Sequence, residues 1–227
     1  MLFASFVLSL SESEVYDIIS PEIVANFSIS YNLSVNILIN VKYRFIYRYF
    51  YFPNTKSTMN YFHSIQPTEI TDNVFKLLDK DWMLVTAGRL GDVNTMTASW
   101  GHLGILWNLP VAIAYIRPQR HTFGFANRYS DYTLSFFTEE HRSILQFCGS
   151  RSGRDHDKIA ETGLTPIETE RGNVIFQEAR LVLECRKIYE DNLKKNNFLL
   201  PEVAQKNYPK DDFHRFYMGE IIHVLAK

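Results

Sequence analysis

The central part of the chain, residues 94–122, reads NTMTASWGHLGILWNLPVAIAYIRPQRHT. It contains two runs rich in apolar and β-branched residues, Thr95–Trp100 and Val111–Arg117, and each run is bounded by Asn, Gly or Pro. Runs of this kind are typical of β-strands that end in turns. The stretch therefore predicts two strands of a sheet, and the same pattern continues on both sides of it.

Five further runs share these features and bring the predicted strands to seven: Trp82–Ala87, Tyr132–Phe137, Val174–Gln177, Ala179–Tyr189 and Phe216–Leu225. Helices are predicted over Thr122–Arg128, Glu139–Cys148 and Asp155–Thr162, the last closed by Gly163. Helices do not alternate with the strands. The pattern therefore favours an antiparallel barrel, a mainly β fold with a few short helices, over a doubly wound parallel sheet.

Residues 1–58 differ in composition from residues 59–227, because they contain no glycine and only eight charged residues. A secretory signal is disfavoured, since Met1–Leu10 has no basic side chain. A membrane span is disfavoured because Lys42, Arg44 and Arg48 interrupt the apolar stretch. We therefore expect an N-terminal extension, translated from upstream of a natural start at Met59, and one domain over residues 59–227.

The charge balance of the 227-residue chain limits the classes of partner that we expect it to bind. It has 24 Lys and Arg against 25 Asp and Glu, a net charge of -1, so we expect neither nucleic acid nor a membrane as a partner. With 46% hydrophobic and 22% charged residues, collagen-like and wholly disordered proteins are excluded. Cys148 and Cys185 are too few for a disulfide framework, which favours a cytoplasmic location.

Several common enzyme motifs are absent from the sequence, among them GxGxxG, GxxxxGK[ST], HExxH and GxSxG. The seven histidines show no spacing typical of metal ligands, so we expect no metal site.

Two polar stretches beside predicted turns are candidates for ligand binding. Asn94–Gly101 is rich in hydroxyl groups that suit a flat polar ligand, although an edge strand with polar outward side chains has the same composition. Arg117–Thr122 places arginines where a helix begins, which suits phosphate, although a solvated charged turn fits equally well.

A third stretch, Ser150–Lys158, has a Ser-Gly-Arg core that is similar to a phosphate-binding nest. Lys158 is expected one turn beyond Arg154 on the same helical face. The alternative is that Asp155 merely caps the helix. Together the three stretches predict an anionic ligand without identifying it.

Cys148, Cys185 and His214 each allow a structural interpretation. Both cysteines lie in apolar runs, which indicates that they are small, buried apolar side chains. The alternative is a redox role for Cys148. His214 stands just before the last predicted strand, where it could face a ligand pocket as a possible catalytic residue or be a buried structural histidine.

Four ordered motifs carry a resemblance to a known family: residues 94–122 quoted above, then YTLSFF, CGSRSGRDHDKIAETGLTP and FHRFYMGEI. Over Asp81–Lys227 the chain resembles the flavin reductase-like family, including flavoredoxin-type proteins. The resemblance implies a split β-barrel of the FMN-binding type, with a Greek-key-like antiparallel arrangement. It also implies a homodimer with FMN at the subunit interface.

The resemblance also implies site residues. The isoalloxazine and ribityl chain would lie against Asn94, Met96, Thr97, Ala98 and Ser99, with Trp100 lining the pocket. The phosphate would lie near Arg117, Arg120, Thr122, Ser152, Arg154 and Lys158, and Gly153 belongs to the same cofactor-binding set. His214 and Arg215 match a histidine-arginine pair near the flavin, whereas His102 replaces a residue that is usually glycine.

The activity implied is that of an NAD(P)H-dependent flavin reductase-like oxidoreductase that passes electrons through FMN to an acceptor, such as free flavin, an oxygenase or a redox protein. Either NADH or NADPH could be the donor. Two alternatives remain: a flavoredoxin-like electron carrier reduced by a protein partner, and a non-flavin binding module for a phosphorylated ligand.

Overall fold

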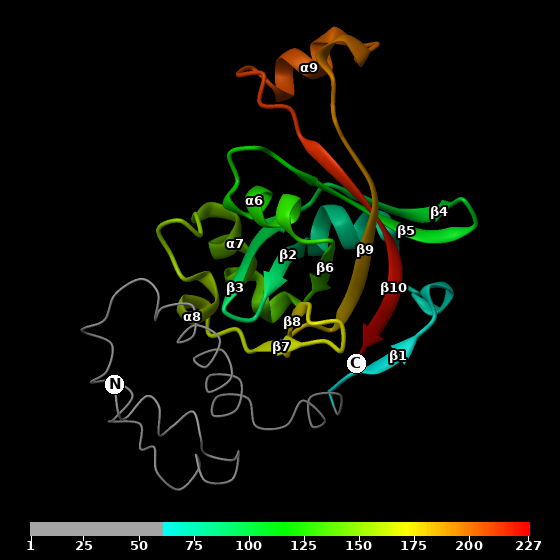
Figure 1. The fold of residues 1–227 in the computed structure, drawn as a ribbon, viewed down its shortest axis with the longest axis vertical. Helices are drawn as coiled ribbons and strands as arrows, with labels where there is room; N and C mark the ends of the chain where they lie inside the picture. Colours follow the sequence, from blue (N-terminus) through cyan, green and yellow to red (C-terminus); the bar gives the residue numbers. More distant parts are fainter. Residues whose placement is uncertain (1–60) are drawn as a thin grey trace, which may run out of the picture. The chain divides into compact units, whose positions relative to one another are not determined.

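A large antiparallel sheet dominates residues 61–227, the part of the chain that the computed structural model describes (Figure 1). Its eight strands follow the order β3-β2-β6-β9-β10-β5-β4, with β1 paired to β10. No pairing among these residues joins β3 to β4, so the sheet is not closed and β3 is an edge strand. The mainly β, antiparallel fold expected from the sequence is confirmed.

The strands of the main sheet are β1 (His63–Ile65), β2 (Met83–Arg89), β3 (Asp92–Ala98), β4 (Gly101–Leu106), β5 (Leu109–Ile116), β6 (Asp131–Phe136), β9 (Leu181–Asn192) and β10 (Arg215–Ala226). A second sheet pairs β7 (Pro166–Glu168) with β8 (Val174–Phe176). Each predicted strand overlaps one of these. The structure adds β1, β4 and β7, which are short or contain glycine or proline and so give a weak strand pattern.

The turn between β4 and β5 explains why this hairpin is missed from the sequence. Trp107 and Asn108 both have positive φ, 53° and 60°. A two-residue turn with two positive φ angles usually carries glycine, and tryptophan is an unusual occupant. The sequence therefore lacks the usual turn residue at the point where the hairpin reverses.

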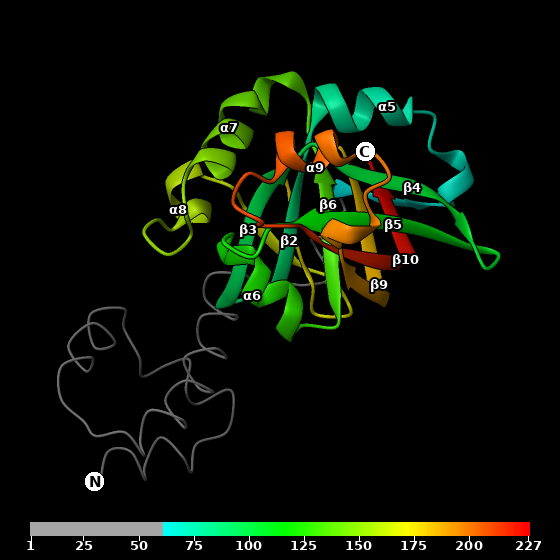
Figure 2. The same cartoon turned by 90° about the horizontal axis from the view of Figure 1, so that it is seen from above.

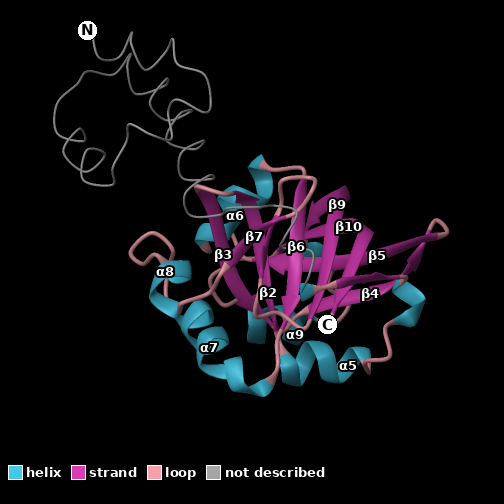
Figure 3. Cartoon of the chain, turned by 90° about the horizontal axis from the view of Figure 1, so that it is seen from below, coloured by secondary structure: helices cyan, strands magenta, loops and turns pink. Residues whose placement is uncertain are grey.

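Helices flank the sheet. They are α5 (Val74–Lys76), α6 (His121–Arg128), α7 (Arg142–Ser150), α8 (Lys158–Thr162) and α9 (Pro201–Asn207). The π-helical turn η4 (Leu77–Asp81) and the 3-10 turns η3 (Pro67–Glu69), η5 (Glu139–His141) and η6 (Lys195–Asn197) complete the set. Figures 2 and 3 show α8, α7 and α5 along one side of the sheet. α7 packs against β3, and α6 packs against β2 and β3.

Helix α8 begins later than predicted. The side chain of Asp157 accepts a hydrogen bond from the Ala160 N–H at 3.1 Å and so starts the helix at Lys158. The predicted start at Asp155, and the shared helical face of Arg154 and Lys158, are wrong because Arg154 precedes the helix. Gly163 ends the helix with a φ of 70°, as expected.

Two apolar clusters sandwich the central strands. Alternate residues of β2 enter opposite clusters, with Met83 and Val85 in one and Leu84 in the other. Because both faces of β2 are covered, its sequence is a continuous apolar run without the alternation of a half-exposed strand.

The segment between β9 and β10, residues 193–214, forms a projecting arm that carries η6 and α9 (Figure 1). The sequence does not predict this arm. Residues 1–58, the expected extension, lie outside the described residues, so the expected domain boundary remains a prediction. In residues 61–227 no helix has the length and apolar character needed to cross a membrane.

Candidate functional site

The polar end of β3 is tied to the start of α6. The Asn94 side chain is buried and donates a hydrogen bond from Nδ2 to Thr122 Oγ1 at 2.6 Å. Thr122 is itself buried in the first turn of α6. The predicted hydroxyl-rich strand and the predicted helix start therefore meet, and the N-terminal end of α6 lies beside an edge strand.

The loop between α7 and α8 packs closely on this junction at Gly153. A Cβ on Gly153 would overlap Asn94 Oδ1 and would lie 3.1 Å from His121 Cδ2. Only glycine fits this approach without displacing a neighbour. Next to it, the Ser152 hydroxyl accepts a hydrogen bond from the Arg154 N–H at 3.2 Å, which orders the loop.

Three cations gather around this junction: Arg120, Arg154 and Lys158, here called the cationic cluster. Each donates to main-chain oxygens: Arg120 Nη2 to Gly149 O at 2.9 Å, Arg154 Nη1 to Gln119 O at 3.1 Å, and Lys158 Nζ to Thr95 O and Cys148 O, both at 2.9 Å. Within residues 61–227 none of the three pairs with a carboxylate. The cluster therefore keeps uncompensated positive charge, which suits an anion.

Lys158 is the buried member of the cluster, with 5% of its surface exposed. Burial is the main cause that lowers its pKa to about 8. Cys148 counteracts this shift while Arg120 adds to it. Because two of its three N–H groups bind main-chain oxygens of β3 and α7, Lys158 also holds these two elements together.

Arg117, also expected near the phosphate, differs from the three residues of the cationic cluster in having a carboxylate partner. It forms a 2.5 Å ion pair with Asp212 and donates to Asn207 O at 2.9 Å, and its guanidinium lies over the Tyr208 ring. Arg117 therefore fastens the arm to the sheet, and its charge is already compensated.

Met96, Thr97 and Ala98, also predicted to contact the ligand, have their side chains engaged within the protein, so only their main-chain atoms could contribute to the site. The side chains of Met96 and Ala98 belong to the hydrophobic core. Thr97 donates a short hydrogen bond from its hydroxyl to Leu145 O, which ties β3 to α7. Since β3 is an edge strand, no further strand among residues 61–227 pairs with its outer side, although Thr95 O already accepts a hydrogen bond from Lys158 Nζ.

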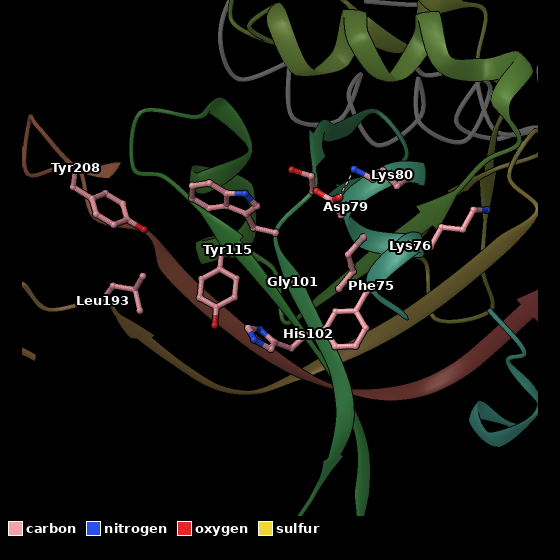
Figure 4. A pocket seen from close by; sticks show the side chains of 12 residues that line it. Phe75, Lys76, Asp79, Lys80, Gly101, His102, Tyr115, Leu193 and Tyr208 are labelled. Carbon is pink, nitrogen blue, oxygen red and sulfur yellow. Dashed lines mark ion pairs between the residues drawn. The ribbon is translucent and has the colours of Figure 1, made fainter. Parts of the chain in front are cut away.

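An aromatic cavity of about 760 Å³ opens beyond the end of β3 (Figure 4). Two predicted residues, Ser99 and Trp100, line it, and the Trp100 side chain is 48% exposed. The rest of its lining comes from α5, η4, β4, β5 and the arm: Phe75, Lys76, Leu78, Asp79, Lys80, Gly101, His102, Tyr115, Leu193 and Tyr208. Its aromatic rings and few charges suit a planar ligand.

His102 lies in this cavity, where its ring meets the Tyr115 ring edge-on at 5.6 Å. His214 lies behind the wall. It is 7% exposed, its Nδ1 is 2.8 Å from the Tyr208 hydroxyl, and its ring is 5.1 Å from the Trp100 ring. Burial, reinforced by Arg117, lowers the pKa of His214 to about 4. His214 is therefore a neutral support for two ring residues of the cavity.

The neighbouring Arg215, on β10, points to other partners. It donates to Asn192, Asn127 and Glu190. The histidine-arginine pair therefore separates into a residue behind the cavity wall and a residue bound on the sheet.

Both thiols are fully buried. Burial raises the pKa of Cys148 to about 11 against a smaller opposing effect of Lys158, and burial raises the pKa of Cys185 further. A thiol held protonated is a poor nucleophile, so the geometry favours the structural interpretation of Cys148. Among residues 61–227, no three His, Cys, Asp or Glu side chains are grouped to hold a metal ion.

Sequence reasoning missed several residues of this region. The cavity residues from η4 and the arm carry no local motif, because strand pairing and the arm bring them together. His121 lies inside the candidate stretch Arg117–Thr122. Its position at the start of α6 is the signal that could have identified it as a site residue.

The comparisons with known proteins agree with this geometry. Residues 77–226 match the family described as flavin reductase like domain. No curated protein sequence matches the chain. Among solved structures, flavoredoxin from Methanosarcina acetivorans is similar, with 20% identity, a TM-score of 0.51, and coverage of 65% of this chain and 68% of that one.

Two further solved structures have the same fold. A FMN-binding domain of a flavin reductases-like enzyme from Shewanella baltica has 18% identity and a TM-score of 0.53, covering 73% of this chain and 76% of that one. A FMN-binding protein from Thermus thermophilus has 18% identity and a TM-score of 0.51, covering 64% and 71%. The predicted split barrel is confirmed, and since the family match spans more than half of the chain, the protein belongs to the flavin reductase like domain family.

Proposed function

We propose that the protein binds FMN with the phosphate at the cationic cluster and the isoalloxazine toward the aromatic cavity. The observation that carries this proposal is the arrangement of three cations, without carboxylate partners in residues 61–227, at one end of β3 and an aromatic cavity at the other. At a rise of about 3.3 Å per residue, Asn94 and Ser99 are about 16 Å apart. This spacing suits a ligand whose anionic end and planar ring are joined by a flexible chain.

In this proposal each residue type has a defined task. Arg120, Arg154 and Lys158 neutralise the phosphate, and the Thr122 and Ser152 hydroxyls with the N–H groups around Gly153 complete its hydrogen bonds. Asn94 fixes the junction, while Thr97, Ser99 and the β3 main chain at Met96 and Ala98 contact the ribityl chain and ring. Trp100 covers one side of the ring.

Arg117 is not part of the proposed phosphate site, because its charge is paired with Asp212. His214 acts by holding Trp100 and Tyr208 in place. Bound FMN supplies hydride and single-electron chemistry, and we propose that NADH or NADPH reduces it before electrons pass to an acceptor.

We further propose that the protein acts as a homodimer with the flavin at the interface. Ile105 and Trp107, at the tip of the β4–β5 hairpin, are 70% and 63% exposed. Exposed apolar side chains that lie together on a hairpin tip can form part of a contact surface. Sedimentation of the FMN-loaded full chain as a monomer at micromolar concentration would count against the dimer.

The test of the redox function is an anaerobic visible spectrum of the full chain with FMN, recorded before and after NADH or NADPH is added. Perturbed flavin bands that bleach with a nucleotide support a flavin reductase. Bands that bind but persist until a protein reductase is added support an electron carrier instead. If the chain does not bind FMN but binds another phosphorylated compound, the result supports the alternative of a non-flavin binding module.

A further inference from the structure

His121 occupies a central place at the proposed phosphate site, although neither its motif nor its spacing assigns it a role. It is the first residue of α6, and its ring packs against Gly153 and meets the Phe125 ring edge-on at 5.2 Å. Neither ring nitrogen has a hydrogen-bond partner within residues 61–227. The half-buried ring is thus available to a ligand and is not needed to satisfy a protein group.

The charges that face His121 are mostly positive. Burial lowers its pKa first, and Arg154, Lys158 and Arg128 lower it further, while Asp155 alone raises it. Arg128 is an exposed residue paired with Asp92, so its charge is partly compensated. The N-terminal end of α6 also disfavours a positive charge at this position. In the absence of an anion, His121 is therefore neutral near pH 7.

A bound phosphate reverses this balance, because an opposite charge within hydrogen-bond range stabilises the imidazolium ion. We propose that His121 is a ligand of the anion held by the cationic cluster and that it takes up a proton when a phosphate monoester binds. This inference rests on the proposed FMN site and adds to it a residue and a proton. The proton comes from solvent, and the imidazolium then donates a hydrogen bond to a phosphate oxygen.

Proton linkage fixes the sign of the pH effect. Because the bound state holds the extra proton, affinity for the phosphate ester falls as pH rises through the pKa of the bound His121. The phosphate group itself titrates near pH 6 with the opposite effect, since it gains charge as pH rises. A comparison of the wild type with His121→Gln cancels this contribution, because both bind the same ligand.

The experiment uses the full chain, His121→Gln, and a matched control, His156→Gln. His156 lies in the neighbouring loop, but its Nδ1 pairs with Glu161 at 3.0 Å. FMN affinity is measured across the pH range by titration calorimetry in two buffers of different ionisation enthalpy. Imidazole NMR signals are followed with and without FMN and inorganic phosphate, and the signal missing from His121→Gln identifies His121.

We expect the wild type and His156→Gln to lose about tenfold more FMN affinity than His121→Gln between about pH 6 and about pH 8. Their binding should also take up more protons, and the His121 signal should shift toward the imidazolium form when FMN or phosphate is added. If FMN binds but the three proteins share one pH profile and the His121 signal is unchanged, this inference is overturned and the FMN site stands. If the wild type binds no FMN, both are overturned.

Discussion

Replacing Gly153 by alanine tests whether the α7–α8 loop, β3 and α6 form one site. The added Cβ would overlap Asn94 Oδ1, and it would also lie 2.9 Å from Asn94 Cγ and 3.1 Å from His121 Cδ2. Asn94 is buried and its Nδ2 is bound to Thr122 and Thr95 O, so it cannot turn aside without losing these bonds. Either the loop or Asn94 must move.

The magnitude follows from these contacts. Overpacking of a closely packed site costs about 1 to 3 kcal/mol, and a lost internal hydrogen bond costs about 1 kcal/mol. We therefore expect Gly153→Ala to lower the free energy of unfolding by about 1 to 3 kcal/mol. FMN affinity should fall as well, because the loop that carries Ser152 and Arg154 is displaced from the junction.

Gly124 provides the matched control. It lies on α6, is exposed, and a Cβ there would meet nothing within 4 Å. Alanine at this helical position should raise the free energy of unfolding by about 0.5 to 1 kcal/mol and leave FMN affinity unchanged. Urea denaturation and FMN fluorescence titration measure both quantities. The reasoning is refuted if Gly153→Ala matches the wild type in both.

The other predictions concern single residues of the site and its surroundings. Arg154→Ala should weaken FMN binding by roughly 1 to 3 kcal/mol in a fluorescence titration, the size of a lost charge-assisted hydrogen bond; an unchanged affinity removes Arg154 from the site. Arg117→Ala should expose residues 193–214 to limited proteolysis and weaken FMN binding through the cavity residues Leu193 and Tyr208, but it should leave the affinity for inorganic phosphate unchanged. A large loss of phosphate affinity would restore Arg117 to the phosphate site. Burial lowers the pKa of Lys158 to about 8 from an ordinary 10.5. FMN affinity should therefore fall as pH rises through about 8, because Lys158 loses its positive charge. Without ligand, the free energy of unfolding should rise between these two pH values, because the unfolded chain still holds the proton that the folded chain has lost. Both effects should vanish in Lys158→Met. Cys148→Ala should keep the turnover number in a steady-state assay, and a large loss with normal folding would indicate a redox thiol.

Much of the sheet could be predicted from the sequence because its central strands carry apolar runs that glycine, proline or asparagine interrupts. β2, β6 and β9 are buried on both faces or paired along their whole length, so their sequences report their structure directly. β4 was missed because Gly101 and Gly104 dilute its pattern. The arm was missed because its shape depends on the length of the β9–β10 pairing, which no local signal encodes.

The candidate site was predictable as a set of stretches but not as a set of contacts. Lys158 illustrates the difference. Its expected place on the face of a helix with Arg154 came from helical spacing, yet Asp157 starts the helix one residue before Lys158. Lys158 joins the cluster through bonds to Thr95 O and Cys148 O, and the first of these partners is distant in sequence.

Arg117 and Arg120 show why an arginine-rich turn alone does not identify an anion site. They lie three residues apart in one turn, and from sequence both suit a phosphate equally. Asp212, near the end of the arm, forms an ion pair with Arg117 just after β5 and compensates its charge. Among the described residues, the Arg120 side chain donates only to the Gly149 carbonyl near the end of α7. What separates a binding cation from a structural one is therefore the presence of a carboxylate partner brought by a distant segment, and this property exists only once the chain has folded.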